Sequence, residues 1–164
     1  MGLSVRAATL EDAEAIRAIY NPEVLESTVT FDLVPRSLDD QRRWLEARSG
    51  AHVVLVAEAD AGEVVGFASL SPYRDRPAYS TTVEDSVYVR RDQQGRGVGR
   101  LLLGELLTVA TDHGFHAVMA RIVGHHGASI RLHEALGFEL VGTEREVGRK
   151  FGRWLDVVLM QRLL

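Results

Sequence analysis

The stretch that best indicates the fold is Val87-Tyr88-Val89-Arg90-Arg91-Asp92-Gln93-Gln94-Gly95-Arg96-Gly97-Val98-Gly99-Arg100-Leu101. Its apolar start predicts the end of a strand, and its last residues begin an amphipathic helix that continues to about His113. Three glycines in five residues separate the strand from the helix. The segment therefore predicts a strand, a glycine-rich loop and a helix in direct succession.

A glycine-rich loop at this place is suited to bind an anion. Glycine lets backbone N–H groups approach a ligand closely, and a helix N-terminus adds unpaired donors and a partial positive charge. The loop thus predicts a pyrophosphate site, with a turn that holds no ligand as the simplest alternative. No Gly-Lys-Ser/Thr follows, which excludes a P-loop, and glycines at 95, 97 and 99 do not match the dinucleotide motif G-x-G-x-x-G. Local positive charge comes from Arg90, Arg91, Arg96 and Arg100.

The composition of the 164-residue chain favours one globular domain, residues 1–164, with 46% hydrophobic and 26% charged residues. The absence of cysteine excludes a disulfide scaffold, a thiolate metal site and a cysteine nucleophile. A net charge of -4 argues against broad nucleic-acid binding. No apolar run approaches the roughly 20 residues that span a bilayer, so we expect a cytoplasmic protein without membrane contact.

Periodicity elsewhere predicts a mixed order of helices and strands. Thr9 and Asp12 precede a helix that we expect Pro22 to end, and Ser37 with Asp40 opens a second helix. The other predicted elements are strands near residues 3–7, 53–57, 64–70, 81–89, 117–122, 138–143 and 154–163 and a helix at 128–136, with helix ends at Gly50, Gly114 and Gly137. About seven strands and four helices indicate an α/β sandwich around a mostly antiparallel sheet.

Two motifs resemble those of the GNAT acyltransferases. Gln94-Gly95-Arg96-Gly97-Val98-Gly99 resembles the acetyl-CoA motif Q/R-x-x-G-x-G/A, and Leu132-His133-Glu134-Ala135-Leu136-Gly137-Phe138 resembles a second landmark, a short helix that ends in L-G-F. Ile19-Tyr20-Asn21, Thr82-Val83-Glu84-Asp85-Ser86-Val87-Tyr88-Val89 and Gly148-Arg149-Lys150-Phe151-Gly152-Arg153-Trp154-Leu155-Asp156 are similar to the phosphinothricin acetyltransferase branch, which includes methionine sulfone and methionine sulfoximine acetyltransferases. The resemblance spans residues 3–163 and implies a GNAT fold.

The resemblance also implies an acetyl-CoA site. The strand before the loop would pair with the pantetheine arm, and the loop amides would hold the pyrophosphate. Where the family usually has an asparagine, this chain has His126, and Ser129 is expected to compensate. The implied contacts are Val87, Tyr88, Val89, Gly95, Arg96, Gly97, Val98, Gly99, Arg100, His126 and Ser129.

Two residues match catalytic positions of the branch. Glu84 corresponds to its general base, which would take a proton from the amine before the lone pair attacks the thioester. His133 stands where most GNAT enzymes have tyrosine, and imidazole can move a proton from the amine or to the sulfur. The simpler alternatives are an exposed strand residue for Glu84 and a structural histidine for His133.

An amino-acid-like substrate carries a carboxylate, which a guanidinium binds well. Arg74 and Arg76 lie on a charged loop before the Glu84 strand and are the expected clamp, unless both are solvated. The implied substrate contacts are Arg74, Asp75, Arg76, Glu84, Asp85, Ser86 and Phe31. Adjacent His125 and His126 on a loop make a poor chelating pair, so no metal is expected.

The sequence therefore predicts an acetyl-CoA-dependent N-acetyltransferase that acts on the amino group of a small amino-acid-like molecule. Two alternatives stay open: an enzyme acetylating protein N-termini or lysines, and a CoA-binding sensor without turnover. The resemblance implies a homodimer, and the expected partner is the small-molecule amine, with neither nucleic acid nor membrane.

Overall fold

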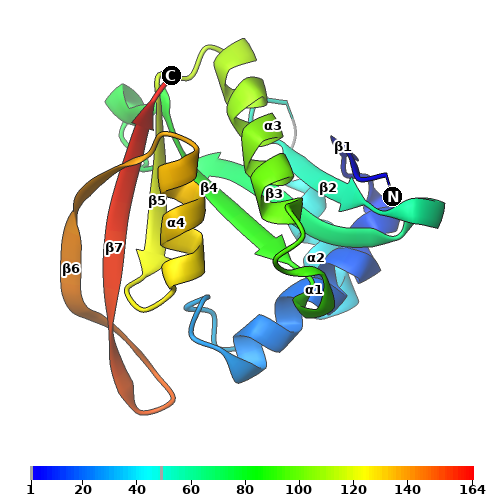
Figure 1. Cartoon of the computed structure of the whole chain (residues 1–164), viewed down its shortest axis with the longest axis horizontal. Helices are drawn as coiled ribbons and strands as arrows, with labels where there is room; N and C mark the ends of the chain where they lie inside the picture. The colour runs from blue at the N-terminus through cyan, green and yellow to red at the C-terminus, as the bar shows by residue number, and fades with distance from the viewer. Residues whose placement is uncertain (1, 49) are drawn as a thin grey trace.

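A computed structural model describes residues 2–48 and 50–164 as one seven-stranded sheet covered by four α-helices (Figure 1). The strands are β1 Ser4–Ala7, β2 Val54–Glu58, β3 Val64–Pro72, β4 Thr82–Val89, β5 Ala117–Val123, β6 Glu139–Lys150 and β7 Arg153–Leu163. The helices are α1 Ala13–Glu26, α2 Leu38–Glu46, α3 Val98–Asp112 and α4 Gly127–Ala135. The strand order is β1-β2-β3-β4-β5-β7-β6, and of the pairs described here β4 with β5 is parallel and the others antiparallel. The predicted α/β fold is confirmed.

The helices cover opposite faces of the sheet. On one face, α3 buries Leu102 and Leu106 against β2, β3 and β5. On the other, α1 and α2 pack Ile16 and Leu45 against Phe67 of β3. Burial of such side chains is the main favourable term in folding, so these two clusters fix the sheet between its helices. None of the helices described is long and apolar enough to cross a membrane.

The predicted caps explain where the helices begin and end. The amide of Asp40 donates to Ser37 Oγ at 3.1 Å, and the amide of Ser37 donates to the Asp40 carboxylate at 3.2 Å, a capping box that opens α2. Gly114 follows α3 with φ +81° and Gly137 follows α4 with φ +85°, a backbone conformation that favours glycine.

Three predicted boundaries are wrong. Helix α1 continues through Pro22 to Glu26. The proline removes one intrahelical hydrogen-bond donor, but the burial of Val24 in the same turn outweighs this loss. Helix α2 ends at Glu46, before Gly50. Strand β6 runs to Lys150 instead of ending near residue 143, and its mostly exposed, bulged course explains why no alternation of apolar residues predicted it.

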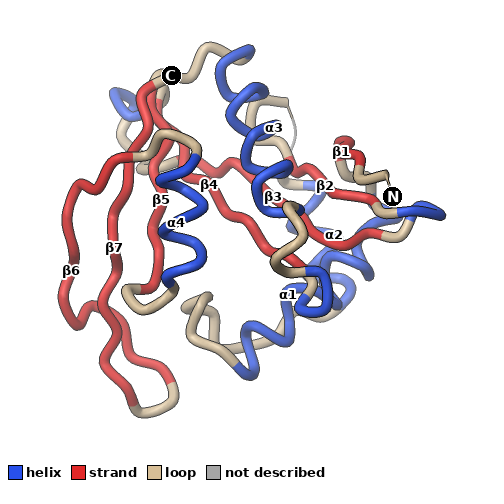
Figure 2. Tube along the Cα trace, in the orientation of Figure 1, coloured by secondary structure: helices blue, strands red, loops and turns tan. Residues whose placement is uncertain are grey.

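Strands β4 and β5 pair over only three residues before they separate. Their ladder joins Thr82–Glu84 to 117–119, and the rest of β4 pairs with β3 alone. Figure 2 shows the wedge that opens between them, with the β6–β7 hairpin running past the end of the sheet beside the loop after α1. The topology therefore places the second half of β4 at the edge of an opening in the sheet.

Candidate active site

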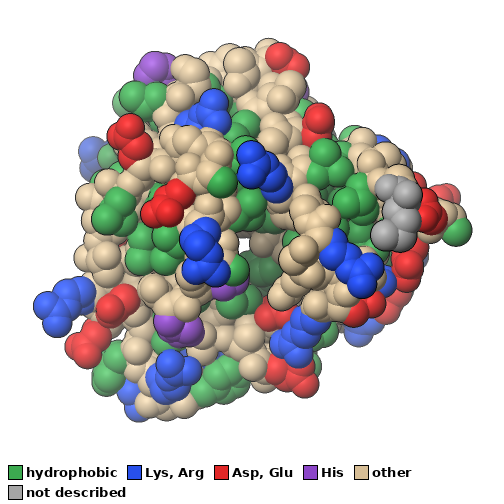
Figure 3. Space-filling model, in the orientation of Figure 1, with side chains coloured by type: hydrophobic (Ala, Val, Ile, Leu, Met, Phe, Trp, Pro, Cys, Tyr) green, Lys and Arg blue, Asp and Glu red, His purple; other side chains and the backbone are tan. Residues whose placement is uncertain are grey.

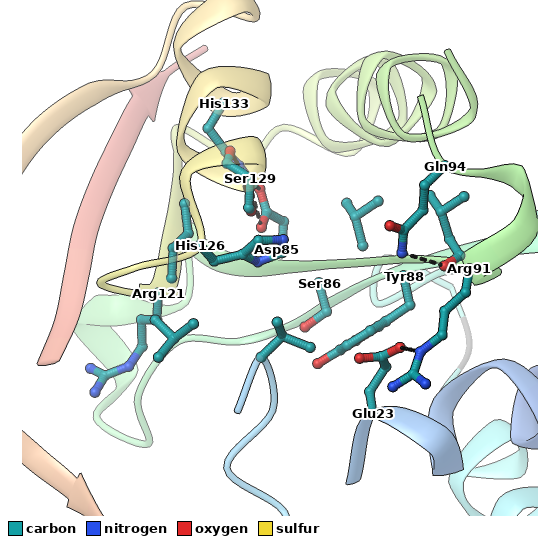
Figure 4. A pocket seen from close by; sticks show the side chains of 15 residues that line it. Glu23, Asp85, Ser86, Tyr88, Arg91, Gln94, Arg121, His126, Ser129 and His133 are labelled. Atoms are coloured by element: carbon teal, nitrogen blue, oxygen red, sulfur yellow. Dashed lines mark hydrogen bonds and ion pairs between the residues drawn. The ribbon is translucent and has the colours of Figure 1, made fainter. Parts of the chain in front are cut away.

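A cleft of about 440 Å³ fills the wedge between β4 and β5. Its wall combines residues from α1, β4, β5 and α4, and a hollow in the middle of the molecular face marks its opening (Figures 3 and 4). Residues far apart in the sequence, such as Glu23, Ser86 and His133, thus line one space.

Strand β4 presents different side chains to the two faces of the sheet. Val87 and Val89 pack with the core beneath α3, whereas Tyr88 packs on Phe67 at a ring-centroid distance of 5.3 Å in the core beneath α1. Because side chains alternate along a strand, Glu84 shares the face of Tyr88, and Asp85 shares the face of Val87. The two neighbouring carboxylates therefore point to opposite sides of the sheet.

A cavity of about 310 Å³ lies between the glycine-rich loop and α4. Gly95 and Gly97 have φ +75° and +86°, and a Cβ added at either would meet nothing within 4 Å. The first intrahelical bond of α3 joins the Leu101 amide to the Gly97 carbonyl, so the amides of residues 98–100 have no partner within the helix. Open space above these amides fits the pyrophosphate expected here.

Most of the expected coenzyme contacts line this cavity. They are Val87, Val89, Gly95, Gly97, Val98, Gly99, Arg100, His126 and Ser129. Two expected contacts, Tyr88 and Arg96, do not line this cavity. Tyr88 faces the other side of the sheet. Gln93, Gln94, Ala128 and Leu132 line it in addition, and of these Gln94 belongs to the motif that the sequence offered.

Two of the four arginines near the loop are held in ion pairs. Arg90 pairs with Asp92 and Glu63 at 2.6 Å, and Arg91 pairs with Glu23 at 2.8 Å and Glu26 at 2.7 Å. Their charges are thus balanced within the chain, and the Arg91 pairs tie the loop to the end of α1. Arg100, in contrast, lines the cavity.

A smaller cavity of about 190 Å³ lies on the other face of β4. Four of the expected substrate contacts, Phe31, Glu84, Asp85 and Ser86, line it. The sequence did not assign the remaining wall to the substrate. It comes from separate segments and consists of Val29, Thr30, Tyr88, Arg121, Val123 and Val157, of which Tyr88 was expected at the coenzyme.

The loop that carries Phe31 is fixed against the β6–β7 hairpin. Lys150 is buried, and its Nζ donates to the carbonyl of Thr30 at 2.9 Å and of Glu23 at 3.4 Å. The ring of Phe31 lies directly on Gly148, where a Cβ would be 3.2 Å from Cδ2 and closer still to two other ring atoms. Thr28 Oγ1 also lies 2.9 Å from His125 Nε2. This contact joins the loop after α1 to the loop before α4.

Glu84 is half-buried at the wall of the smaller cavity. Burial raises the pKa of its carboxyl above the ordinary value, Arg121 opposes this rise, and neighbouring Asp85 adds to it. A carboxylate with a raised pKa is a stronger base, which suits the role expected for Glu84.

His133 is engaged at both ring nitrogens. Its Nε2 lies 3.0 and 3.1 Å from the two oxygens of Asp85, and its Nδ1 lies 2.7 Å from the carbonyl of Ser129. Burial lowers the pKa of His133, but the hydrogen bond and charge of Asp85 and the Ser129 carbonyl raise it by more. His133 lines the larger cleft, and Asp85 lines both cavities.

The charged loop lies apart from these cavities. The side chains of Arg74, Asp75 and Arg76 are exposed. They line neither the cleft nor the cavities of about 310 and 190 Å³. The Arg74 guanidinium instead covers the rings of Tyr73 and Tyr79 at 4.9 and 5.5 Å. The chain therefore does not bring its expected carboxylate clamp to its own cleft.

His125 and His126, the adjacent histidines before α4, both lie at the cleft. His125 contacts Thr28, and His126 lines the cleft, where burial lowers the pKa of its imidazole. Over residues 2–48 and 50–164, no three His, Cys, Asp or Glu side chains are grouped to hold a metal ion.

The sequence and the fold resemble those of known acetyltransferases. Residues 5–159 match the family model of the acetyltransferase (GNAT) domain. The chain is 43% identical over 162 residues to an L-methionine sulfoximine/L-methionine sulfone acetyltransferase of Pseudomonas paraeruginosa, covering 98% of this chain and 94% of that protein. It is 41% identical over 165 residues to a phosphinothricin N-acetyltransferase of Streptomyces coelicolor, covering 99% and 96%.

One of the similar solved structures contains acetyl-CoA. The phosphinothricin acetyltransferase of Sinorhizobium meliloti in complex with AcCoA matches with a TM-score of 0.96 at 39% identity, over 100% of this chain and 89% of that one. Fold and site together define an acetyl-CoA-dependent N-acetyltransferase. The chain belongs to the GNAT acetyltransferase family, as its motifs predicted.

Proposed function

We propose that this acetyltransferase transfers the acetyl group of acetyl-CoA to the amino group of a small amino-acid-like molecule of the phosphinothricin, methionine sulfone or methionine sulfoximine type. The observation that carries the proposal is the position of Glu84. Its carboxylate, with a raised pKa, stands at a small cavity that adjoins the coenzyme side of the cleft across one strand. The names of the relatives support the same substrate class.

The smaller cavity is the amine side of the cleft in this proposal, and its dimensions favour a small molecule over a peptide. The cavity measures about 190 Å³, and the loop over it is fixed by Lys150 from the hairpin and by His125 from the loop before α4. A polypeptide would need an open groove on this side, so acetylation of protein N-termini or lysines is the less suitable function.

In the proposed mechanism, acetyl-CoA supplies the acetyl group as a thioester. The amides at the start of α3 and Arg100 hold its pyrophosphate, and Val87 and Val89 border its arm. Glu84 takes the proton of the substrate ammonium and so frees the attacking lone pair. The walls of the smaller cavity, among them half-buried Tyr88 and buried Val123, keep water from the reacting groups.

A panel of amines tests the substrate class. Acetyl-CoA is mixed with methionine sulfone, phosphinothricin, the decarboxylated analogue of methionine sulfone and a short peptide, and the released thiol is measured. We expect the two amino acids to have the highest kcat/KM. Preference for the peptide, or equal kcat/KM for the decarboxylated amine, would contradict the proposed class.

We also propose that the protein is a cytoplasmic homodimer whose second protomer supplies the carboxylate clamp. Exposed apolar side chains along the β6–β7 hairpin offer a surface for such an interface: Leu140, Val141, Val147, Phe151 and Trp154. Since Arg74 and Arg76 line no part of their own cleft, they would act on the substrate only from a neighbouring protomer.

Light scattering and one double variant test this arrangement. A dimer mass is expected, and Arg74→Ala combined with Arg76→Ala should raise KM for methionine sulfone while leaving KM for the decarboxylated amine unchanged. The matched control is Arg17→Ala, an arginine on α1 paired with Glu14 at 3.1 Å outside the cleft. A monomer mass, or equal effects on both amines, would reject the clamp.

A further inference from the structure

Asp85 and His133 form a buried pair that joins β4 to α4. The two side chains are 4% and 3% exposed, and 48 residues separate them in the chain. Asp85 is the first residue of β4 beyond its ladder with β5, so the pair lies where the cleft begins. The mechanism described so far gives this pair no role.

The acceptors around His133 determine its protonation. The Asp85 carboxylate faces Nε2 at 3.0 Å, and the Ser129 carbonyl faces Nδ1 at 2.7 Å. Neither an ionised carboxylate nor a carbonyl carries a hydrogen, so each ring nitrogen must donate one. An imidazole that donates from both nitrogens is the positively charged imidazolium.

Besides Asp85, the charged side chains that line the cleft with His133 are Glu23, Arg91 and Arg121, and Arg91 pairs with Glu23. His126, which precedes α4, is the second titratable group that faces it, and the ring of Phe138 packs edge-on at a centroid distance of 4.8 Å. Glu84 points to the opposite face of the sheet, toward the amine cavity. Of the negative groups of the cleft, Asp85 is therefore the one that contacts His133 and favours its imidazolium form.

We propose that Asp85 is a positioning residue that holds His133 as an imidazolium on the coenzyme side of the sheet, where the positive charge stabilises the departing sulfur. This inference rests on the proposed acyl transfer. It separates two tasks between neighbouring residues of β4: Glu84 serves the amine on one face, and Asp85 serves the leaving group on the other through His133.

The step balances without a proton from His133. The amine nitrogen bonds to the acetyl carbon, the carbon–sulfur bond breaks, and the sulfur leaves with the electron pair. Glu84 takes the ammonium proton before the attack and gives it to solvent, and the second proton, which the nitrogen loses as the amide forms, passes through solvent water to the thiolate. His133 keeps both of its protons because each is held by an acceptor, and it acts as a fixed charge where negative charge develops.

Titration of His133 in the ligand-free enzyme tests the protonation directly. Imidazole resonances are followed by NMR from acid to alkaline pH, and His133→Gln identifies the signal. We expect His133 to be protonated at neutral pH and to titrate at lower pH in Asp85→Asn. A neutral His133 in the wild-type enzyme, or an unchanged midpoint in Asp85→Asn, would overturn the proposal.

A double-mutant cycle tests whether Asp85 acts through His133. Asp85→Asn should lower kcat by about tenfold with little change in the Kd of acetyl-CoA. In the His133→Gln background the same substitution should have no further effect. Additive losses would overturn the positioning role, and Glu134→Gln, an exposed neighbour on α4, is the control that should retain full kcat.

Two readouts keep this inference separate from the proposed substrate class. Thiol release is measured with any amine that the enzyme accepts, so failure of the amino-acid preference leaves the cycle interpretable. If Asp85→Asn does not fold, the titration of His133 in the wild-type enzyme decides the question, because a neutral imidazole at neutral pH excludes the imidazolium.

Discussion

The two sides of the cleft are built in different ways. The coenzyme side consists largely of one continuous segment, residues 87–100, completed by the start of α4. The amine side takes its wall from the loop after α1 and from β4, β5 and β7, and β6 supports it through Lys150 and Gly148. A binding site made from one local segment can be identified by a motif, whereas one assembled by tertiary packing leaves no such signal.

Substitution of the base should give the largest effect on the amine side. Glu84→Gln keeps the shape of the side chain and removes the charge, so kcat should fall by about tenfold to hundredfold. The Kd of acetyl-CoA should change little, because Glu84 lines the amine cavity and not the coenzyme cavity. Stopped assays of thiol release and calorimetry measure the two quantities.

The pH profile gives the same prediction a second readout. A base acts in its deprotonated form, so wild-type kcat/KM should decline as pH falls through the pKa of Glu84, which burial raises. Glu84→Gln should lack this acid limb. Equal turnover of the two enzymes between about pH 6 and pH 9 would show that Glu84 is not the base.

On the coenzyme side, Gly97→Val should weaken acetyl-CoA binding by about tenfold. Gly97 has φ +86°, which costs a branched residue roughly 1–2 kcal/mol, and its side chain would enter the open space above the loop amides. Calorimetry on the folded variant measures the affinity. The matched control is Gly104→Ala within α3, where a Cβ meets nothing within 4 Å and binding should persist; wild-type affinity of Gly97→Val would show that this loop does not hold the phosphates.

The same contrast explains what the sequence could predict. Glycines between strand and helix, a capping box at Ser37 and the glycine helix ends at Gly114 and Gly137 are local signals, and the structure has each of them. The seven strands and the mostly antiparallel sheet also followed, because the apolar strands that form the core alternate or are continuously buried. These features depend on the residues of one segment and its immediate neighbours.

The features that escaped prediction depend on distant partners. The balance of the Arg91 charge requires Glu23 from α1, and the extent of β6 requires β7 as its neighbour. The pairing of Asp85 with His133 likewise joins residues 48 positions apart. Sequence patterns indicate that such residues are polar or exposed, but only the folded chain determines which of them meet.

The smallest predicted effect probes how β6 supports the amine side. The ring of Phe31 packs on Gly148. A Cβ added at Gly148 would be 3.2 Å from Phe31 Cδ2 and closer to two other ring atoms. Phe31 is 43% exposed, so its ring can move outward without breaking the core. Gly148→Ala should therefore change the shape of the amine cavity while the fold and the coenzyme side remain intact.

We expect Gly148→Ala to raise KM for the amino acid by about threefold, roughly 0.6 kcal/mol, with the Kd of acetyl-CoA unchanged. The matched control is Gly142→Ala on the same strand, where a Cβ meets nothing within 4 Å and KM should stay at the wild-type value. Equal KM values for the two variants would mean that Phe31 does not shape the amine cavity. A change in acetyl-CoA affinity in Gly148→Ala alone would mean that the two sides of the cleft are coupled, contrary to their separate construction.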